Sequence, residues 1–177
     1  MRTIDRETSA LLVVDFQARL MPAIEDGADA VANTRRLLAA AGLLDVPVTF
    51  TEQNPQGLGG TVAGLGAGVH GPVLHKMAFD ACRDHAVGQL TKRPDVVVAG
   101  CEAHVCVLQT VLGLLDAGQR VYVVQDAVGA RRAESKSAAL RRMERHGAEI
   151  VTTEMVVFEW LATADHPRFR EAIALIK

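Results

Sequence analysis

Six short runs of apolar, β-prone residues recur along the chain, and segments with helical spacing separate most of them. This alternation constrains the fold more than any other feature, because strands joined through helices pair in parallel by right-handed crossovers. The clearest strand is Asp-Val-Val-Val-Ala-Gly at 95–100, and the run at 10–14 is apolar enough to be buried on both faces of a sheet. The other predicted strands are 46–51, 72–75, 120–124 and 148–152, and the predicted helices are 28–42, 104–117 and 132–146.

The fold class that follows is α/β, an open, doubly wound, mostly parallel six-stranded sheet with helices on both faces. The chain has 177 residues, which suits one domain over 1–177 with a full core. A closed eightfold barrel needs about 250 residues and is excluded.

Composition excludes several classes of function. Nineteen basic residues against 21 acidic ones leave a net charge of −2, which argues against a nucleic-acid partner. No apolar run approaches the ~20 residues of a membrane span, and the first ten residues mix charges, unlike a signal peptide. The odd number of cysteines, three, indicates a reducing compartment. We therefore expect a cytoplasmic protein with no membrane partner.

A glycine-rich loop interrupts the pattern at 52–71. It holds seven glycines and Pro55, and no strong helix or strand is predicted there. A loop of this length in a compact domain is usually a lid, a binding loop or a partner arm, and the alternative is a flexible excursion.

Three chemically reactive side chains follow predicted strands. Asp15 comes directly after the first strand, Lys76 follows the third, and Cys106 follows the fourth near the start of a predicted helix. In open α/β sheets the carboxyl ends of the strands form the ligand site. A thiol in the first turn of a helix is favoured as thiolate, and a partly desolvated Asp15 with a raised pKa could take the thiol proton and return it to a leaving group.

Each of these residues also has an ordinary structural interpretation. An aspartate after a strand is often a cap or turn residue, and a lone lysine is usually solvated. Cys106, like Cys101 and Cys82, could be a small core residue. Only their convergence at one edge of the sheet favours chemistry.

Several segments of the sequence resemble those of a known family. The segments that carry the resemblance are Ala-Leu-Leu-Val-Val-Asp-Phe-Gln at 10–17, Lys76, and Gly-Cys-Glu-Ala-His-Val-Cys-Val at 100–107. Further segments agree in order at 33–38, 51–53, 125–128 and 153–159. Together they are similar to the isochorismatase-like cysteine hydrolases, and most similar to the metal-free branch that contains isochorismatase domain-containing proteins.

The resemblance implies a parallel sheet and an Asp–Lys–Cys triad of Asp15, Lys76 and Cys106. Cys106 would attack an electrophilic carbon, Asp15 would act as base and then acid, and Lys76 would hold both in register. The family also implies an oxyanion hole from the backbone N–H groups of Val105 and Cys106, and a non-proline cis peptide within 101–103.

Two departures from the family pattern limit the substrate. Nicotinamidases carry a metal-binding Asp-x-His-x-x-His run after the second strand, whereas residues 51–56 here contain no histidine. We therefore expect no catalytic metal and no cofactor. Many family amidases carry a hydroxyl residue three positions before the cysteine, and Ala103 stands there instead.

Besides Ala103, two further residues are substrate or loop candidates. Gln17 shares a strand face with Asp15, so it could orient substrate or bond to backbone. Glu102, on the loop before the cysteine, could meet substrate or be a solvated turn residue.

The sequence thus predicts a cysteine hydrolase that cleaves a small amide or related C–N bond through a thioester-type intermediate. The substrate is a small molecule of unspecified identity, and the apolar fraction and apolar C-terminal stretch favour a homo-oligomer. The alternative is a catalytically silent oligomeric scaffold or binding protein of the same fold. A nucleotide-binding domain is disfavoured because residues 15–19 contain no glycine.

Overall fold

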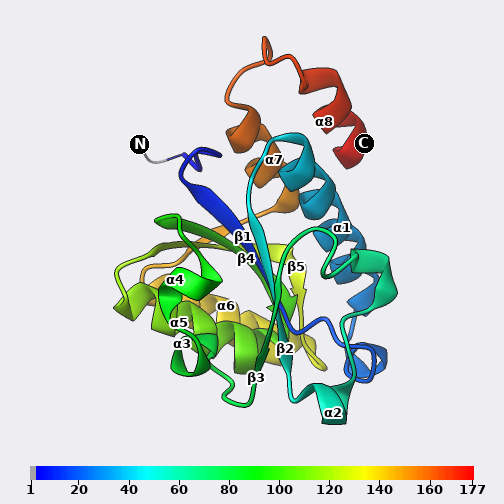
Figure 1. Ribbon diagram of the computed structural model, residues 1–177, viewed down its shortest axis with the longest axis vertical. Coiled ribbons are helices and arrows are strands. Elements are labelled where there is room, and N and C mark those ends of the chain that lie inside the picture. The colour runs from blue at the N-terminus through cyan, green and yellow to red at the C-terminus, as the bar shows by residue number, and fades with distance from the viewer. Residues whose placement is uncertain (1–2) are drawn as a thin grey trace.

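A computed structural model describes residues 3–177 (Figure 1). Within this range the strands form one sheet in the order β3-β2-β1-β4-β5-β6, and every neighbouring pair is parallel. The predicted doubly wound α/β fold is confirmed, with the sheet wholly rather than mostly parallel. The strands are β1 (Ser9–Val14), β2 (Val48–Gln53), β3 (Val73–Lys76), β4 (Asp95–Cys101), β5 (Arg120–Gly129) and β6 (Glu149–Val151).

Helices cover both faces of the sheet, and the strands bury side chains toward each. Along β1, Leu11 and Val13 belong to one core cluster while Leu12 and Val14 belong to the other, because successive strand residues point to opposite faces. One face carries α1 (Gly27–Leu43), α7 (Thr153–Leu161) and α8 (Phe169–Ile176), and the other carries α3 (Ala81–Asp84), α4 (Val87–Leu90), α5 (Leu108–Asp116) and α6 (Ala133–Arg145) (Figure 1).

Glycines end two of the helices at the positions expected. Gly118 follows α5 with φ of 80°, and Gly147 follows α6 with φ of 103°. These left-handed backbone conformations are common after the last turn of a helix and favour glycine. None of the helices in residues 3–177 combines the length and the apolar character needed to cross a membrane.

Several predicted boundaries were wrong by a few residues. β2 spans 48–53 rather than 46–51, because Pro47 has no N–H to donate to a neighbouring strand. β5 is longer than predicted and ends at Gly129. Its pairing with β4 shifts register between Val98 and Gly100, and the two strands pair again where Gly100 lies opposite Val128. The predicted helix 104–117 is split into a five-residue π-helical turn, Ala103–Val107, and α5.

The glycine-rich stretch 52–71 contains more regular structure than predicted. Its first two residues belong to β2, and it holds two short turns, α2 (Pro55–Leu58) and η2 (Ala63–Leu65). Its backbone pairs with the segment after β1: Ala18 N–H donates to Gly60 O at 3.0 Å, and Val62 N–H donates to Phe16 O at 2.8 Å. The stretch is therefore attached to the carboxyl end of β1 rather than projecting freely.

Gly100 lies where β4 passes β1 beside the segment that carries Asp15. Its φ is 155°, and a Cβ at this position would lie 2.5 Å from Val14 O and 2.6 Å from Val14 Cβ. A side chain cannot be added there without moving one of the two central strands.

We expect Gly100→Ala to destabilise the protein by about 3 kcal/mol, because the extra methyl overpacks the β1–β4 contact. Urea unfolding measures the change. Gly42→Ala is the matched control: a Cβ at Gly42 meets nothing within 4 Å in α1, and alanine there should be neutral or stabilising by up to ~1 kcal/mol. Equal stability of Gly100→Ala and the unmodified protein would contradict this packing argument.

Candidate active site

The carboxyl ends of three strands carry the predicted reactive side chains. Asp15 directly follows β1, Lys76 is the last residue of β3, and Cys106 lies in the π-helical turn after β4. β1 and β4 are neighbours, and the helices that follow them, α1 and α5, cover opposite faces. This is the topological switch point at which open α/β sheets form ligand sites.

Asp15 and Lys76 form a fully buried ion pair. Lys76 Nζ lies 2.7 Å from Asp15 Oδ2, and both side chains have 0% exposure. Thr51 on β2 donates its hydroxyl to Asp15 Oδ1 at 2.7 Å, and Asp15 N–H donates to Thr51 O at 3.1 Å. Both carboxylate oxygens are thus bonded, as a buried charge requires.

The Lys76 ammonium is surrounded by acceptors. Besides Asp15, it donates to Gln53 Oε1 at 3.0 Å and to the backbone carbonyls of Ala78 at 3.3 Å and Phe79 at 3.2 Å. An ammonium has three N–H groups and no acceptor, so oxygen ligands alone suit its charged form. The site therefore holds a fixed cation at the end of β3.

The Cys106 thiol lies against this pair and is almost buried, with 6% exposure. Burial, followed by the Asp15 charge, raises the pKa of Cys106 to about 12, while Lys76 opposes the rise; hydrogen bonds to Asp15 and Lys76 also affect this pKa. The start of a helix and a nearby ammonium were expected to favour the thiolate, whereas burial favours the protonated thiol. Cys106 sits in a tight, desolvated turn before α5, where burial outweighs the helix-terminal field.

The backbone N–H groups of the turn that carries Cys106 are only partly free. Glu102 O accepts from Val105 N–H at 3.0 Å and from Val107 N–H at 3.2 Å. An oxyanion would therefore be a second acceptor for the Val105 N–H, beside Glu102 O. The peptide between Cys101 and Glu102 is cis, within the expected interval.

The Glu102 side chain is buried and paired, which contradicts one of its two sequence-based interpretations. It is 7% exposed, so it is not a solvated turn residue. Its Oε2 accepts from Arg131 Nε at 2.9 Å and from Arg131 N–H at 3.1 Å, and a contact between Glu102 and substrate stays a prediction. Glu102 therefore links two segments: its carbonyl bonds to the turn that carries Cys106, and its side chain bonds to Arg131, just after β5.

Gln17 takes the backbone-bonding alternative. Its Nε2 donates to Gln53 O at 2.9 Å and to Gly59 O at 2.6 Å, and its Oε1 accepts from Gln53 N–H at 2.7 Å. It joins β2 to the glycine-rich stretch. Ala103, the third substrate candidate, is 0% exposed and packs in the same core cluster as Cys106.

Sequence reasoning missed two residues that hold the ion pair, Thr51 and Gln53. Both lie on β2, two positions apart, and so point to the same face of the sheet. Polar residues at alternate positions near the carboxyl end of a buried strand were the available signal. Glu52, between them, points the other way and accepts from Thr61 N–H at 2.7 Å and Thr61 Oγ1 at 2.8 Å, which anchors the glycine-rich stretch.

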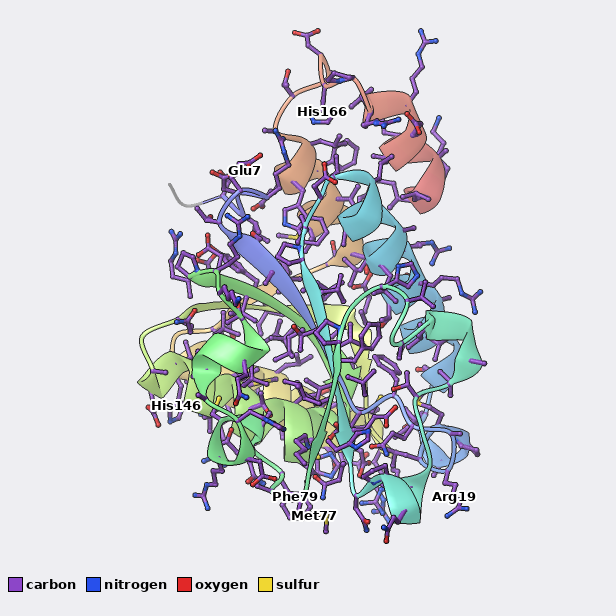
Figure 2. All side chains as sticks on the ribbon, viewed as in Figure 1. Glu7, Arg19, Met77, Phe79, His146 and His166 are labelled. Carbon is purple, nitrogen blue, oxygen red and sulfur yellow. The ribbon has the colours of Figure 1, made fainter. Side chains whose placement is uncertain are left out.

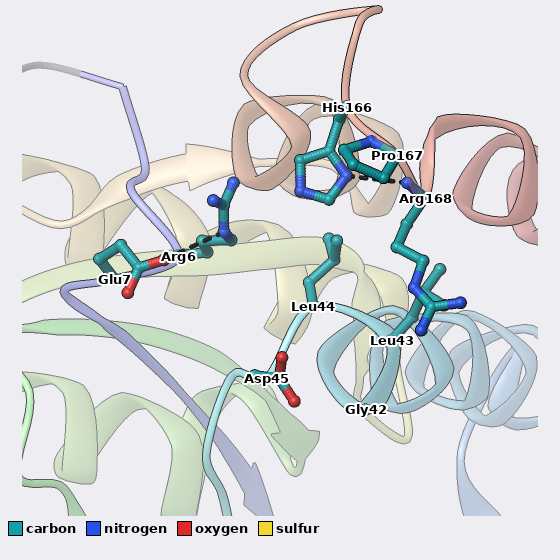
Figure 3. Close-up of a pocket in the computed structure, with 9 residues that line it drawn as sticks. All are labelled: Arg6, Glu7, Gly42, Leu43, Leu44, Asp45, His166, Pro167 and Arg168. Carbon is teal, nitrogen blue, oxygen red and sulfur yellow. Dashed lines mark hydrogen bonds and ion pairs between the residues drawn. The ribbon is translucent and has the colours of Figure 1, made fainter.

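A hollow of about 520 Å³ lies at the opposite end of the sheet (Figure 3). There Arg6 pairs with Glu7 at 3.2 Å and donates to Trp160 O at 3.1 Å. Figure 2 places Glu7 and His166 at this end and Met77 and Phe79, which follow β3, at the other. The hollow therefore takes no part in the site of Asp15, Lys76 and Cys106.

Among residues 3–177, no three or more His, Cys, Asp or Glu side chains gather so as to hold a metal ion. The absence of a catalytic metal and of a cofactor stays a prediction.

Comparison with known proteins agrees with the family resemblance seen in the sequence. The family model described as the Isochorismatase domain matches residues 9–155. Isochorismatase domain-containing protein 2 of Pongo abelii is 40% identical over 176 residues, which cover 96% of this chain and 83% of that protein.

Solved structures share the fold over nearly the whole chain. The MAR1 ribonuclease of Caenorhabditis elegans superposes with a TM-score of 0.93 and 38% identity, covering 98% of this chain and 92% of that one. The YcaC gene product of Escherichia coli, an octameric hydrolase of unknown specificity, superposes with a TM-score of 0.86 and 24% identity, covering 99% and 88%.

The ion pair predicts a large stability effect. We expect Lys76→Met to destabilise the protein by about 3–5 kcal/mol, because it leaves the Asp15 carboxylate buried without its partner. Combining it with Asp15→Asn should recover much of this loss. Lys92→Met, at an exposed lysine, is the control and should stay within ~0.5 kcal/mol. Denaturant unfolding measures all three, and a stable Lys76→Met protein would argue against a charged pair.

The raised pKa of Cys106 predicts how its alkylation depends on pH. In the folded protein the iodoacetamide rate at Cys106 should climb about tenfold per pH unit from 7 to 10, because the thiolate fraction does so below the pKa. In urea the rate should level off near pH ~9. Peptide mapping separates the three cysteines. A plateau below pH 8 in the folded protein would instead indicate a resting thiolate.

Proposed function

Because this chain belongs to the isochorismatase domain family of hydrolases, we propose that it is a cysteine-nucleophile hydrolase that cleaves a small amide or related C–N bond. The observation that carries the proposal is the placement of a buried thiol against a buried carboxylate–ammonium pair. A core cysteine with no chemical role would gain nothing from two buried charges, which are costly to desolvate.

In the proposed first step, Cys106 Sγ attacks the substrate carbonyl carbon while its proton passes to Asp15. The thiol is protonated at rest, because its pKa is about 12, so proton transfer accompanies C–S bond formation. Charge then develops on the carbonyl oxygen, and the Cys106 N–H is the backbone donor proposed for it. When the C–N bond breaks, Asp15 returns the proton to the leaving nitrogen.

Hydrolysis of the thioester-type intermediate uses Asp15 again, with water as the attacking group and sulfur as the leaving group. Water attacks the acyl carbon, Asp15 takes its proton, and the proton returns to sulfur when the C–S bond breaks. Lys76 does not transfer a proton in this scheme. Its fixed charge, held by four oxygen acceptors, balances the negative charge that moves between Asp15 and the carbonyl oxygen.

Burial of the reacting groups supports a small-molecule substrate. As whole residues, Asp15, Lys76 and Cys106 are 0%, 3% and 6% exposed, so a polymer backbone would have difficulty reaching them. We also propose a cytoplasmic homo-oligomer. Its support is the exposed apolar pair Met155 and Phe158 on α7, together with the octameric state of the E. coli YcaC gene product.

RNA is the second candidate substrate, because the C. elegans relative is described as a ribonuclease. The net charge of −2 and the buried site favour the small molecule. The catalytically silent scaffold is the third possibility, and the same experiment tests all three.

We expect Cys106→Ala to lower turnover of a responsive small amide by ~1,000-fold or more, since the covalent step is lost. Cys82→Ala, at a cysteine outside the site, is the matched control and should turn over normally. Mass spectrometry of the unmodified protein should find the acyl group on the Cys106 peptide. Turnover that survives Cys106→Ala would contradict the mechanism. Cleavage of labelled RNA alone would favour the second candidate, and no turnover or adduct across the panel would favour the scaffold.

A further inference from the structure

The chain folds back over the Lys76 side chain directly after β3. The ammonium of Lys76 donates to the carbonyls of Ala78 and Phe79, which are only two and three residues further along. The geometry of this turn, 77–79, therefore fixes two of the four oxygens around the cation. Contacts that fix the turn 77–79 therefore also fix the position of the Lys76 ammonium.

Asp84, the last residue of α3, binds the outer side of this turn. Its Oδ2 accepts from Met77 N–H at 2.6 Å and from Ala78 N–H at 2.8 Å. Ala78 thus donates its N–H to Asp84 and accepts at its carbonyl from Lys76, through the two peptide groups that flank its Cα. These two backbone hydrogen bonds lower the pKa of Asp84, so its carboxylate stays charged at neutral pH.

Thr110 makes a second contact with the same turn and links it to the helix that follows Cys106. Thr110 lies on α5, the helix that continues from the Cys106 turn, and is fully buried. Its Oγ1 accepts from Ala81 N–H at 3.1 Å and approaches Phe79 O at 3.5 Å. The turn 77–79 is thus fastened to α3 by Asp84 and to α5 by Thr110.

We propose that Asp84 is a positioning residue for the proposed hydrolase site: by holding the turn 77–79, it holds the Lys76 ammonium against Asp15 and the Cys106 thiol. Asp84 touches none of the reacting atoms. It lines a hollow of about 530 Å³ on the outer side of β3, together with Arg83 and His85. The inference rests on the proposed function for its effect on turnover, but its effect on the thiol does not depend on any substrate.

Other charges near the turn do not replace Asp84. Asp80 caps α3 by accepting from Cys82 N–H at 2.8 Å, and Arg83 faces Asp80 at 3.9 Å. The His85 ring bonds to His75 O at 2.7 Å. Asp84 is therefore the carboxylate whose removal should loosen the turn, and Asp80→Asn is a matched control that removes a nearby charge and keeps the cap.

The test follows the alkylation rate of Cys106 and the turnover of Asp84→Ala, Asp84→Asn and Asp80→Asn. With Lys76 less firmly held, the thiol loses the cation that favours thiolate. We expect Asp84→Ala to lower both the iodoacetamide rate of Cys106 at pH 9 and kcat by about tenfold, with KM within about twofold. Asp84→Asn should lose only about threefold, since its amide oxygen can still accept, and Asp80→Asn should match the unmodified protein.

Cys82 lies on α3 itself, so its alkylation rate in the Asp84 variants reports whether that helix stays folded. The Asp80→Asn control is compared at Cys106 alone, because Asp80 raises the pKa of Cys82. An Asp84→Ala protein with unchanged Cys106 alkylation would overturn the proposal. So would a loss at Cys106 accompanied by faster alkylation of Cys82, because local unfolding of α3 would then be the cause. If Cys106→Ala retains turnover while Asp84→Ala still slows Cys106 alkylation, the proposed function fails and the positioning role stands.

Discussion

The buried pair of Asp15 and Lys76 is the interaction on which the rest of the site depends. Two opposite charges without solvent are tolerable only when every remaining oxygen and N–H of the pair has a partner. Here a hydroxyl from β2, an amide from β2 and two carbonyls from the turn after β3 complete the set. The thiol is then added to an arrangement that is already electrically balanced.

The sheet order explains how these partners arrive together. β3, β2, β1 and β4 are successive neighbours and all parallel, so their carboxyl ends lie along one edge. Asp15 stands between β2, which supplies Thr51 and Gln53, and β4, which leads to Cys106. A protein with this topology needs no long-range loop to assemble such a site, because the register of the strands does so.

Much of this arrangement could be predicted from the sequence, and the remainder had identifiable physical causes. Apolar runs revealed the strands, and their carboxyl ends revealed Asp15, Lys76 and Cys106. The protonation of Cys106 could not be predicted, because burial in a π-helical turn is a tertiary property. The pairing of Glu102 with Arg131 was also hidden, since 29 residues separate them and neither forms a recognisable motif. Thr51 and Gln53 were visible as polar residues on an apolar strand, but no rule of spacing assigned them to a lysine.

The position of Lys76 in the sheet has a consequence for how the site behaves in the native ensemble. β3 is an edge strand of four residues whose one neighbour is β2. Short edge elements open locally at a lower free energy than central strands. The carboxylate directly follows β1 and the thiol lies in the turn after β4, whereas the cation belongs to the outermost strand. The electrostatic balance of the two central strands therefore depends on the docking of their least supported neighbour.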